Sequence, residues 1–163
     1  IIKHMPGHGF ASHDSHFELP IVKASKKELL TNDFAVFRAF CDTEIAMSAH
    51  VLFEAIDPYS AASTSKKLVD IIRNDIKFSG LLLSDDISMA ALPGNIKKRT
   101  INLIEAGNDV ILHCNGKLFE MKEIVESGVV PNTLTLSRMS SVIEERKKIE
   151  HTKIKNIESS QNS

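Results

Sequence analysis

The sequence lacks the features that mark several classes of protein. The chain has 163 residues and a formal net charge of −1, so no excess of charge predicts binding to nucleic acid or to a cationic partner. No stretch approaches the roughly 18 uninterrupted apolar residues of a membrane-spanning helix, and no secretory signal is visible at the start. We therefore predict no nucleic-acid partner and no membrane partner.

Cysteine is also scarce. Cys41 and Cys114 lie far apart in the sequence and form no C-x-x-C pair. Two reduced, mostly buried thiols in a cytosolic protein are favoured over a disulfide between them. We therefore expect a cytoplasmic protein, and we predict no cofactor.

Short apolar runs alternate with segments of helical periodicity along the chain. Ser25 and Glu28 have the spacing of a capping box, and Gly107 has the position of a helix C-cap. The runs predicted as strands are 1–5, 44–53, 78–86 and 109–113. The segments predicted as helices are 25–40, 65–76, 96–106, 117–127 and 135–150.

This alternation predicts an α/β fold with a parallel sheet and right-handed crossovers. The predicted strands are apolar throughout, which is typical of a sheet that is covered on both faces. We expect one domain over residues 1–150. The tail 151–163 is polar and lacks periodicity, so we predict that it is disordered.

Polar side chains follow three of the predicted strands directly. Lys3 and His4 stand at the end of the first, His50 at the end of the second, and Asp85 with Asp86 at the end of the third. Because the carboxyl ends of parallel strands meet at one edge of a sheet or barrel, we expect these side chains to lie on one rim.

The acid Asp85 allows two interpretations. An Asp directly after a strand often caps the helix that follows. Asp86 beside it shifts the balance, because one acid can cap while the other faces the cleft. A carboxylate held near the anomeric carbon of a sugar can attack it and form a covalent glycosyl-enzyme.

The loop 3–20 is rich in histidine. It contains four of them, His4, His8, His13 and His16. A metal site is one hypothesis, but the spacings match neither an HExxH helix nor a zinc-finger pattern, so we predict no metal. Asp14 lies two residues before His16, close enough for its carboxylate to orient the imidazole for proton transfer. A turn that stabilises the loop explains the same spacing equally well.

Together these segments resemble a known family. KHMPGHG, then DSH, then AMSAHV, then FSGLLLSDDISMAAL is similar to the pattern of the bacterial β-N-acetylglucosaminidases of glycoside hydrolase family 3. The resemblance covers residues 1 to about 115, and Met5 replaces the usual Phe after K-H. It implies a (β/α)8 barrel that removes terminal N-acetylglucosamine from peptidoglycan fragments in cell-wall recycling, with retention of configuration.

The resemblance also implies roles for individual residues. The first acid of S-D-D, Asp85, is the nucleophile, and Asp86 supports its loop. The histidine of D-S-H, His16, is the general acid/base and is assisted by Asp14. Lys3 and His4 match the K-H pair that holds sugar hydroxyls.

The chain is short for such a barrel, which takes about 250 residues. We count four βα units, and the N-terminal units that the resemblance implies, with their acidic and arginine residues, have no counterpart in the sequence. We therefore expect the C-terminal half of the barrel, with a separate N-terminal half-barrel as a possible partner. An inactive remnant of such an enzyme is the main alternative. A metal-dependent hydrolase is a further alternative. The β-glucosidase branch of the family is disfavoured, because its acid/base is usually a carboxylate from another domain.

Overall fold

The computed structural model describes residues 1–11 and 13–161, with side chains up to Ile149. It divides into two units, Ile1–Val130 and Pro131–Ser163. The strands are β1 (Ile2–Met5), β2 (Ile21–Val22), β3 (Ile45–Ser48), β4 (Leu52–Phe53), β5 (Leu81–Asp86) and β6 (Val110–Leu112). The helices are α1 (Lys26–Thr31), α2 (Asp33–Arg38), the 3-10 turn η1 (Ala62–Thr64), α3 (Lys66–Asn74), α4 (Ile96–Ala106), α5 (Leu118–Val125) and α6 (Thr133–Gln161).

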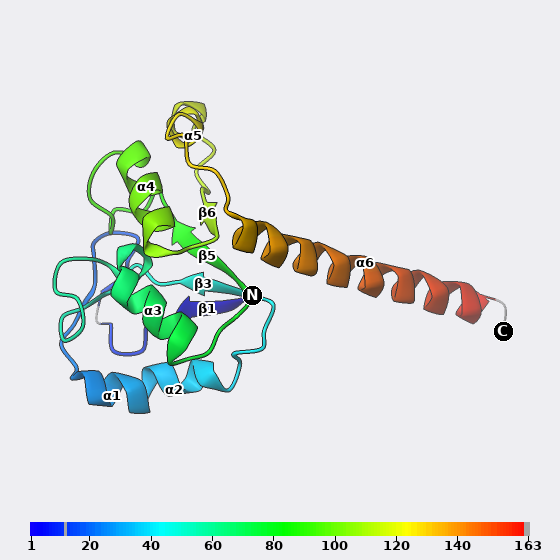
Figure 1. The fold of residues 1–163 in the computed structure, drawn as a ribbon, viewed down its shortest axis with the longest axis horizontal. Helices are drawn as coiled ribbons and strands as arrows, with labels where there is room; N and C mark the ends of the chain where they lie inside the picture. The colour runs from blue at the N-terminus through cyan, green and yellow to red at the C-terminus, as the bar shows by residue number, and fades with distance from the viewer. Residues whose placement is uncertain (12, 162–163) are drawn as a thin grey trace. The chain divides into compact units, whose positions relative to one another are not determined.

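The central sheet has four strands in the order β1-β3-β5-β6, and every neighbouring pair is parallel. The arrows of β1, β3 and β5 lie side by side in the first unit, with helices around them (Figure 1). The predicted parallel α/β architecture is therefore confirmed. In the part of the chain that the structure describes, β1 and β6 form the two edges of this sheet, and it does not close on itself.

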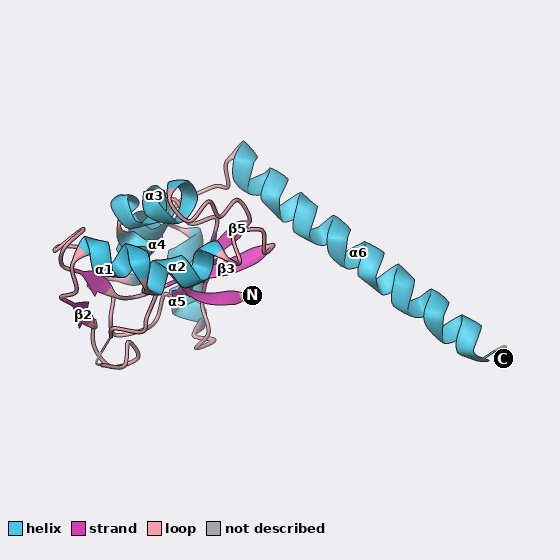
Figure 2. Ribbon diagram, turned by 90° about the horizontal axis from the view of Figure 1, so that it is seen from below, coloured by secondary structure: helices cyan, strands magenta, loops and turns pink. Residues whose placement is uncertain are grey.

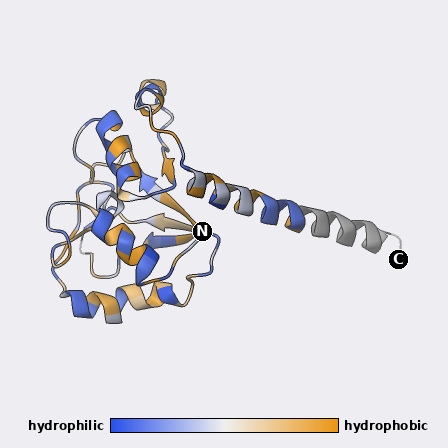
Figure 3. Cartoon of the chain, viewed as in Figure 1, coloured by the Kyte–Doolittle hydropathy of each residue, from blue (hydrophilic) through white to orange (hydrophobic). Residues whose placement is uncertain are grey.

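The core lies between the sheet and its helices. Ala46, Ser48 and Leu82, which alternate along β3 and β5, are completely buried. Leu68 and Ile72 are the matching buried residues of α3. Hydrophobic residues lie along one side of α3 and hydrophilic residues along the other (Figure 3), as expected for a helix that covers a sheet.

The helix predicted over 25–40 is divided in the structure. The Ser25–Glu28 capping box is present, but the backbone of Asn32 is not helical and separates α1 from α2. Asp33, the first residue of α2, accepts hydrogen bonds from the backbone N–H groups of Gly9 and Phe10. Helical periodicity does not reveal this break, because it depends on a contact with a distant loop.

The strand predicted over 44–53 is also divided. It forms β3 and then β4, which pairs with β2 in a separate two-stranded parallel sheet. Figure 2 shows β2 apart from the strands of the central sheet. The residues between β3 and β4 include His50, which therefore lies at the carboxyl end of β3.

Several further predictions can be compared with the structure. Helix α4 ends as predicted, with Gly107 in the left-handed region (φ 111°). Both cysteines are free thiols, but Cys114 is exposed, so the expectation of mostly buried thiols is wrong for it. Helix α6 continues to Gln161, where no regular structure was predicted beyond residue 150, and residues 162–163 lie outside the described residues. Among the described residues, no helix is both long and apolar enough to span a bilayer.

Candidate active site

A cavity of about 430 Å³ lies at the carboxyl end of the sheet. Its walls come from β1, from β5 and from the loop that follows β1. The residues that line it are Lys3, His4, His8, Asp14, Ser15, His16 and Asp85. The structure thus brings together all five residues predicted for the site: Lys3, His4, Asp14, His16 and Asp85. Their individual roles stay predictions.

Asp85 is the acid that faces the cavity. Its Oδ1 accepts a hydrogen bond of 2.9 Å from the backbone N–H of Asp86, and its Oδ2 lies 3.4 Å from Nε2 of His4. The interpretation of Asp85 as a helix cap is wrong, because α4 begins eleven residues later, at Ile96, and is capped by the side chain of Asn95.

Asp86 is committed to its own loop. Its Oδ1 accepts hydrogen bonds from the N–H groups of Ser88 and Cys114, and its Oδ2 accepts one of 2.7 Å from Ser88 Oγ. Both carboxylate oxygens therefore hold backbone or side-chain donors. The two adjacent acids are distinguished by these contacts, and the geometry agrees with a supporting place for Asp86.

The pair of Asp14 and His16 sits on the exposed loop. Nδ1 of His16 lies 2.7 Å from Oδ1 of Asp14, which also accepts the backbone N–H of His16 at 2.9 Å. The side chains are 57% and 71% exposed. The turn and the carboxylate–imidazole pair, weighed above as alternatives, are thus present together.

This pair changes the acidity of both groups. The backbone and side-chain hydrogen bonds from His16 lower the pKa of Asp14 below its ordinary value. The hydrogen bond to Asp14 raises the pKa of His16 above its ordinary value. Because the Nδ1–H donates to Asp14, Nε2 is the nitrogen that exchanges a proton. The imidazole is therefore suited to act as an acid and then as a base.

His4 has a different environment from His16. It is half-buried, and desolvation lowers the pKa of its imidazole, although the charge of Asp85 opposes that effect. Its ring lies 5.5 Å from the ring of His8, centroid to centroid. A neutral His4 beside the carboxylate fits the donation of a hydrogen bond better than the transfer of a proton.

Sequence reasoning gave no individual role to His8 or Ser15, although both line the cavity. The signal for His8 was its place in the loop directly after Lys3 and His4. His13, by contrast, does not line the cavity and lies 3.7 Å from a carboxylate oxygen of Glu18. Over the described residues, no group of three or more His, Cys, Asp or Glu side chains is arranged to hold a metal ion.

Comparison with known proteins agrees with this geometry. The model of the glycosyl hydrolase family 3 N terminal domain matches residues 1–144. The chain belongs to this family.

Individual relatives show how much of this family 3 chain is shared. A β-hexosaminidase from Neisseria meningitidis serogroup B is 39% identical over 140 residues, which are 83% of this chain and 38% of the relative. Native NagZ from Neisseria gonorrhoeae is 36% identical with a TM-score of 0.72, covering 83% of this chain and 40% of that one. A family 3 β-N-acetylglucosaminidase from Paenibacillus sp. str. FPU-7 has a TM-score of 0.81 and 27% identity. The match covers 89% of this chain and 30% of that one.

These matches correct one expectation. We expected the C-terminal half of a barrel, whereas the matching model is that of the N-terminal domain of family 3. A βα unit has the same pattern wherever it occurs in a barrel, so a count of units cannot place a segment within the whole enzyme. The family 3 chain spans 34% and 38% of the length of the first two curated relatives.

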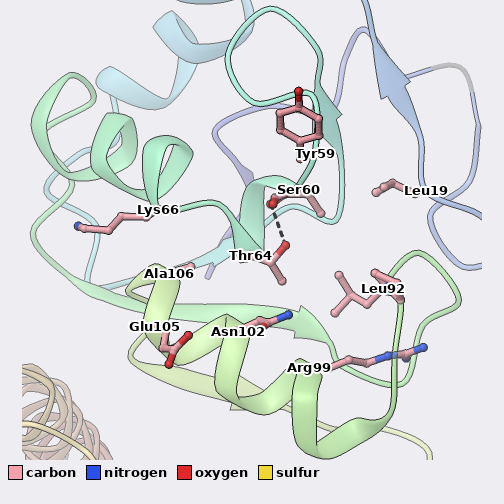
Figure 4. Close-up of a pocket in the computed structure, with 12 residues that line it drawn as sticks. Leu19, Tyr59, Ser60, Thr64, Lys66, Leu92, Arg99, Asn102, Glu105 and Ala106 are labelled. Carbon is pink, nitrogen blue, oxygen red and sulfur yellow. Dashed lines mark hydrogen bonds between the residues drawn. The ribbon is translucent and has the colours of Figure 1, made fainter.

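The family 3 chain has a second cavity, of about 410 Å³, which the sequence analysis did not predict. Figure 4 shows Leu92, Arg99 and Asn102 around it, with Tyr59 at its edge. The guanidinium of Arg99 donates to the carbonyls of Gly94, Ile87 and Met89, so this side chain holds the loop after β5. The cavity lacks the acid and imidazole pair of the first one.

Proposed function

We propose that this chain supplies the catalytic groups of a retaining exo-β-N-acetylglucosaminidase, which removes terminal N-acetylglucosamine from peptidoglycan fragments. The observation that carries the proposal is one cavity lined by both Asp85 and His16. The names of the relatives, β-hexosaminidase and β-N-acetylglucosaminidase, support the substrate class.

In the first step Asp85 is the nucleophile. An oxygen of its carboxylate attacks the anomeric carbon, and the bond from that carbon to the leaving oxygen breaks. Protonated His16 gives its Nε2 proton to the leaving oxygen, so that the aglycone departs as a neutral alcohol. The product of this step is a covalent glycosyl ester on Asp85.

In the second step the same groups work in reverse. Neutral His16 takes a proton from water at Nε2 while the water oxygen attacks the anomeric carbon. The ester bond to Asp85 breaks and the carboxylate is restored. Two displacements at one carbon give net retention of configuration.

The remaining residues of the cavity prepare these steps. Asp14 fixes the tautomer of His16 and stabilises its imidazolium form. Lys3 and His4, which also line the cavity, hold sugar hydroxyls in the proposed mechanism. Asp86 keeps the loop after β5 in place through Ser88 and Cys114.

The proposed enzyme needs more strands than this chain provides. A parallel sheet of four strands with edges at β1 and β6 exposes unpaired backbone groups, and closure into a (β/α)8 barrel would pair them. We propose that the rest of the barrel, in the same polypeptide or in a second one, completes the sheet. The cytoplasm is the proposed location, to be tested by cell fractionation.

The test is hydrolysis of 4-nitrophenyl N-acetyl-β-D-glucosaminide by the chain co-folded with the rest of a barrel from the Neisseria meningitidis relative. We expect release of 4-nitrophenol, and NMR spectroscopy should show the β-anomer of N-acetylglucosamine as the first product. Peptidoglycan fragments with terminal N-acetylglucosamine should lose that sugar.

Two outcomes would count against the proposal. A folded assembly that leaves both substrates intact would favour the inactive remnant. First formation of the α-anomer would exclude the double displacement at Asp85. Covalent trapping with a fluorinated N-acetylglucosamine analogue adds a direct check, because the mass increase should map to the peptide that contains Asp85.

A further inference from the structure

His50 is a buried polar group that the proposed mechanism leaves without a role. It follows β3 at the rim of the sheet, its side chain is completely buried, and each ring nitrogen has a partner. Nδ1 lies 2.7 Å from Ser63 Oγ, and Nε2 lies 3.1 Å from the backbone oxygen of Asp86. An imidazole with a partner at each ring nitrogen has a fixed orientation, so it can in turn fix the position of the groups that it contacts.

The two partners determine which nitrogen carries the proton. A backbone carbonyl only accepts hydrogen bonds, so the Nε2–H of His50 donates to the Asp86 oxygen. Nδ1 is then the acceptor, and the hydroxyl of Ser63 donates to it. Burial lowers the pKa of His50, which favours this neutral form.

Ser63 is itself held in place by buried groups. Its backbone oxygen accepts a hydrogen bond of 2.7 Å from Asn108 Nδ2, and Asn108 Oδ1 accepts one of 2.7 Å from Ser48 Oγ. The backbone N–H of Ser63 donates to the oxygen of Ala49. A continuous chain of hydrogen bonds therefore runs from the core to His50.

The carbonyl that His50 holds is that of Asp86, the residue after Asp85, and it belongs to the peptide group between Asp86 and Ile87. The next carbonyls, those of Ile87 and Met89, are held from another side by Arg99. His50 thus holds the carbonyl of the residue after the proposed nucleophile, whereas His4 contacts the carboxylate of Asp85 itself. A displaced Asp86 carbonyl would rotate the backbone on which the Asp85 carboxylate stands.

We propose that His50 is a positioning residue, whose Nε2–H holds the Asp86 carbonyl and so aims the Asp85 carboxylate into the cavity. The value of this position for catalysis rests on the proposed function, whereas the contact itself does not. The contact between His4 and Asp85 reports the position of the carboxylate without any substrate.

The test uses a matched pair of variants in the whole chain. In His50→Gln the amide NH₂ reaches the place of Nε2 and can donate to Asp86, whereas in His50→Asn the amide lies near Nδ1 and cannot. NMR titration of the His4 imidazole should be close to wild type in His50→Gln and clearly shifted in His50→Asn. Equal shifts in both variants would mean a packing role and would overturn the proposal.

A third variant covers the case in which His50→Asn does not fold. In the wild type, ¹⁵N NMR of the His50 ring should show the Nε2–H tautomer throughout pH 5–8. Ser63→Ala removes the donor to Nδ1 and should leave the Nε2–H tautomer in place, because the Asp86 carbonyl still accepts only from a ring N–H. A wild-type ring that carries its proton on Nδ1, or that titrates in this range, would contradict the proposed contact.

Activity supplies the last readout. In the co-folded assembly, His50→Asn should lower kcat about 100-fold with KM nearly unchanged, and His50→Gln should recover most of the loss. A wild-type assembly without activity would refute the proposed function, and the NMR results would then decide on His50 alone. Loss confined to KM would overturn the positioning role.

Discussion

The two sides of the candidate active site are built differently. Asp85 stands at the end of a central strand, its side chain 14% exposed and its loop held by His50, Arg99 and Asp86. His16 stands on an irregular loop, and its side chain is 71% exposed. In the proposed mechanism, the attacking group is therefore fixed in advance, whereas the group that transfers the proton can adjust to the substrate.

Substitution of each of the two adjacent acids, Asp85 and Asp86, should have the largest effect on activity. Asp85→Asn should lower the rate of the assembled enzyme on the order of 10⁴-fold or more, because an amide is not a nucleophile for the anomeric carbon. Asp86→Asn should lose much less activity, since its oxygens serve the loop. Initial rates on the nitrophenyl substrate measure both, and comparable losses would show that the two acids are not distinguished as their contacts indicate.

The strand that carries Asp85 is held in place by buried contacts of Asp109, which a substitution can remove. Its Oδ2 accepts hydrogen bonds from Arg73, at 2.6 Å, and from the backbone N–H of Leu82, and the side chain is 3% exposed. Asp109→Ala leaves a mostly buried guanidinium without this partner, so the free energy of unfolding should fall by about 3–5 kcal/mol. Urea denaturation measures this.

Asp70→Ala is the matched control for that experiment. Asp70 pairs with Lys66 on the surface of α3, and this exposed ion pair should contribute less than about 1 kcal/mol. Similar losses in the free energy of unfolding for Asp109→Ala and Asp70→Ala would show that the buried ion pair is no more important than the exposed one.

The anchor of the exposed loop can be tested at Gly7. A Cβ atom built there would lie 2.6 Å from Cβ of Asp33, the residue that holds Gly9 and Phe10. Gly7→Ala should therefore displace the base of the loop and destabilise the chain by about 1–3 kcal/mol. Thermal unfolding measures the cost, with Gly9→Ala as a second probe of the same contact. An unchanged midpoint would show that the loop is not anchored there.

The smallest expected effect concerns pH. Asp14 raises the pKa of His16, so the proton that the acid step requires is retained to higher pH than in an isolated imidazole. Asp14→Asn should move the alkaline limb of the pH–rate profile to lower pH. Any contribution that the raised pKa of His16 makes to stability is present below its unfolded value, about 6.5, and is lost as pH rises through the raised folded value.

NMR titration of His16 in wild type and Asp14→Asn checks this prediction without substrate. The wild-type midpoint should be the higher of the two. An equal midpoint would mean that the Asp14 contact does not act on the imidazole, and the two sides of the cavity would then differ only in exposure.

Local patterns in the sequence were enough for much of the fold and of the candidate site. Alternating apolar and amphipathic segments predicted the parallel order of the strands, and Gly107 and the Ser25–Glu28 box marked helix ends correctly. The motifs named five residues, Lys3, His4, Asp14, His16 and Asp85, and all five line one cavity. These predictions succeeded because they depend on the backbone geometry of short segments and on the rule that parallel strands end at one rim.

Features that depend on contacts between distant segments were decided only by the tertiary structure. It divided the helix at Asn32 and the strand before His50, and it distinguished Asp85 from Asp86, two identical side chains in adjacent positions. It also gave His50 partners from two distant segments. The physical reason is that a side chain's role depends on the groups it meets across the fold, and those groups are brought together only when the sheet and its loops have packed.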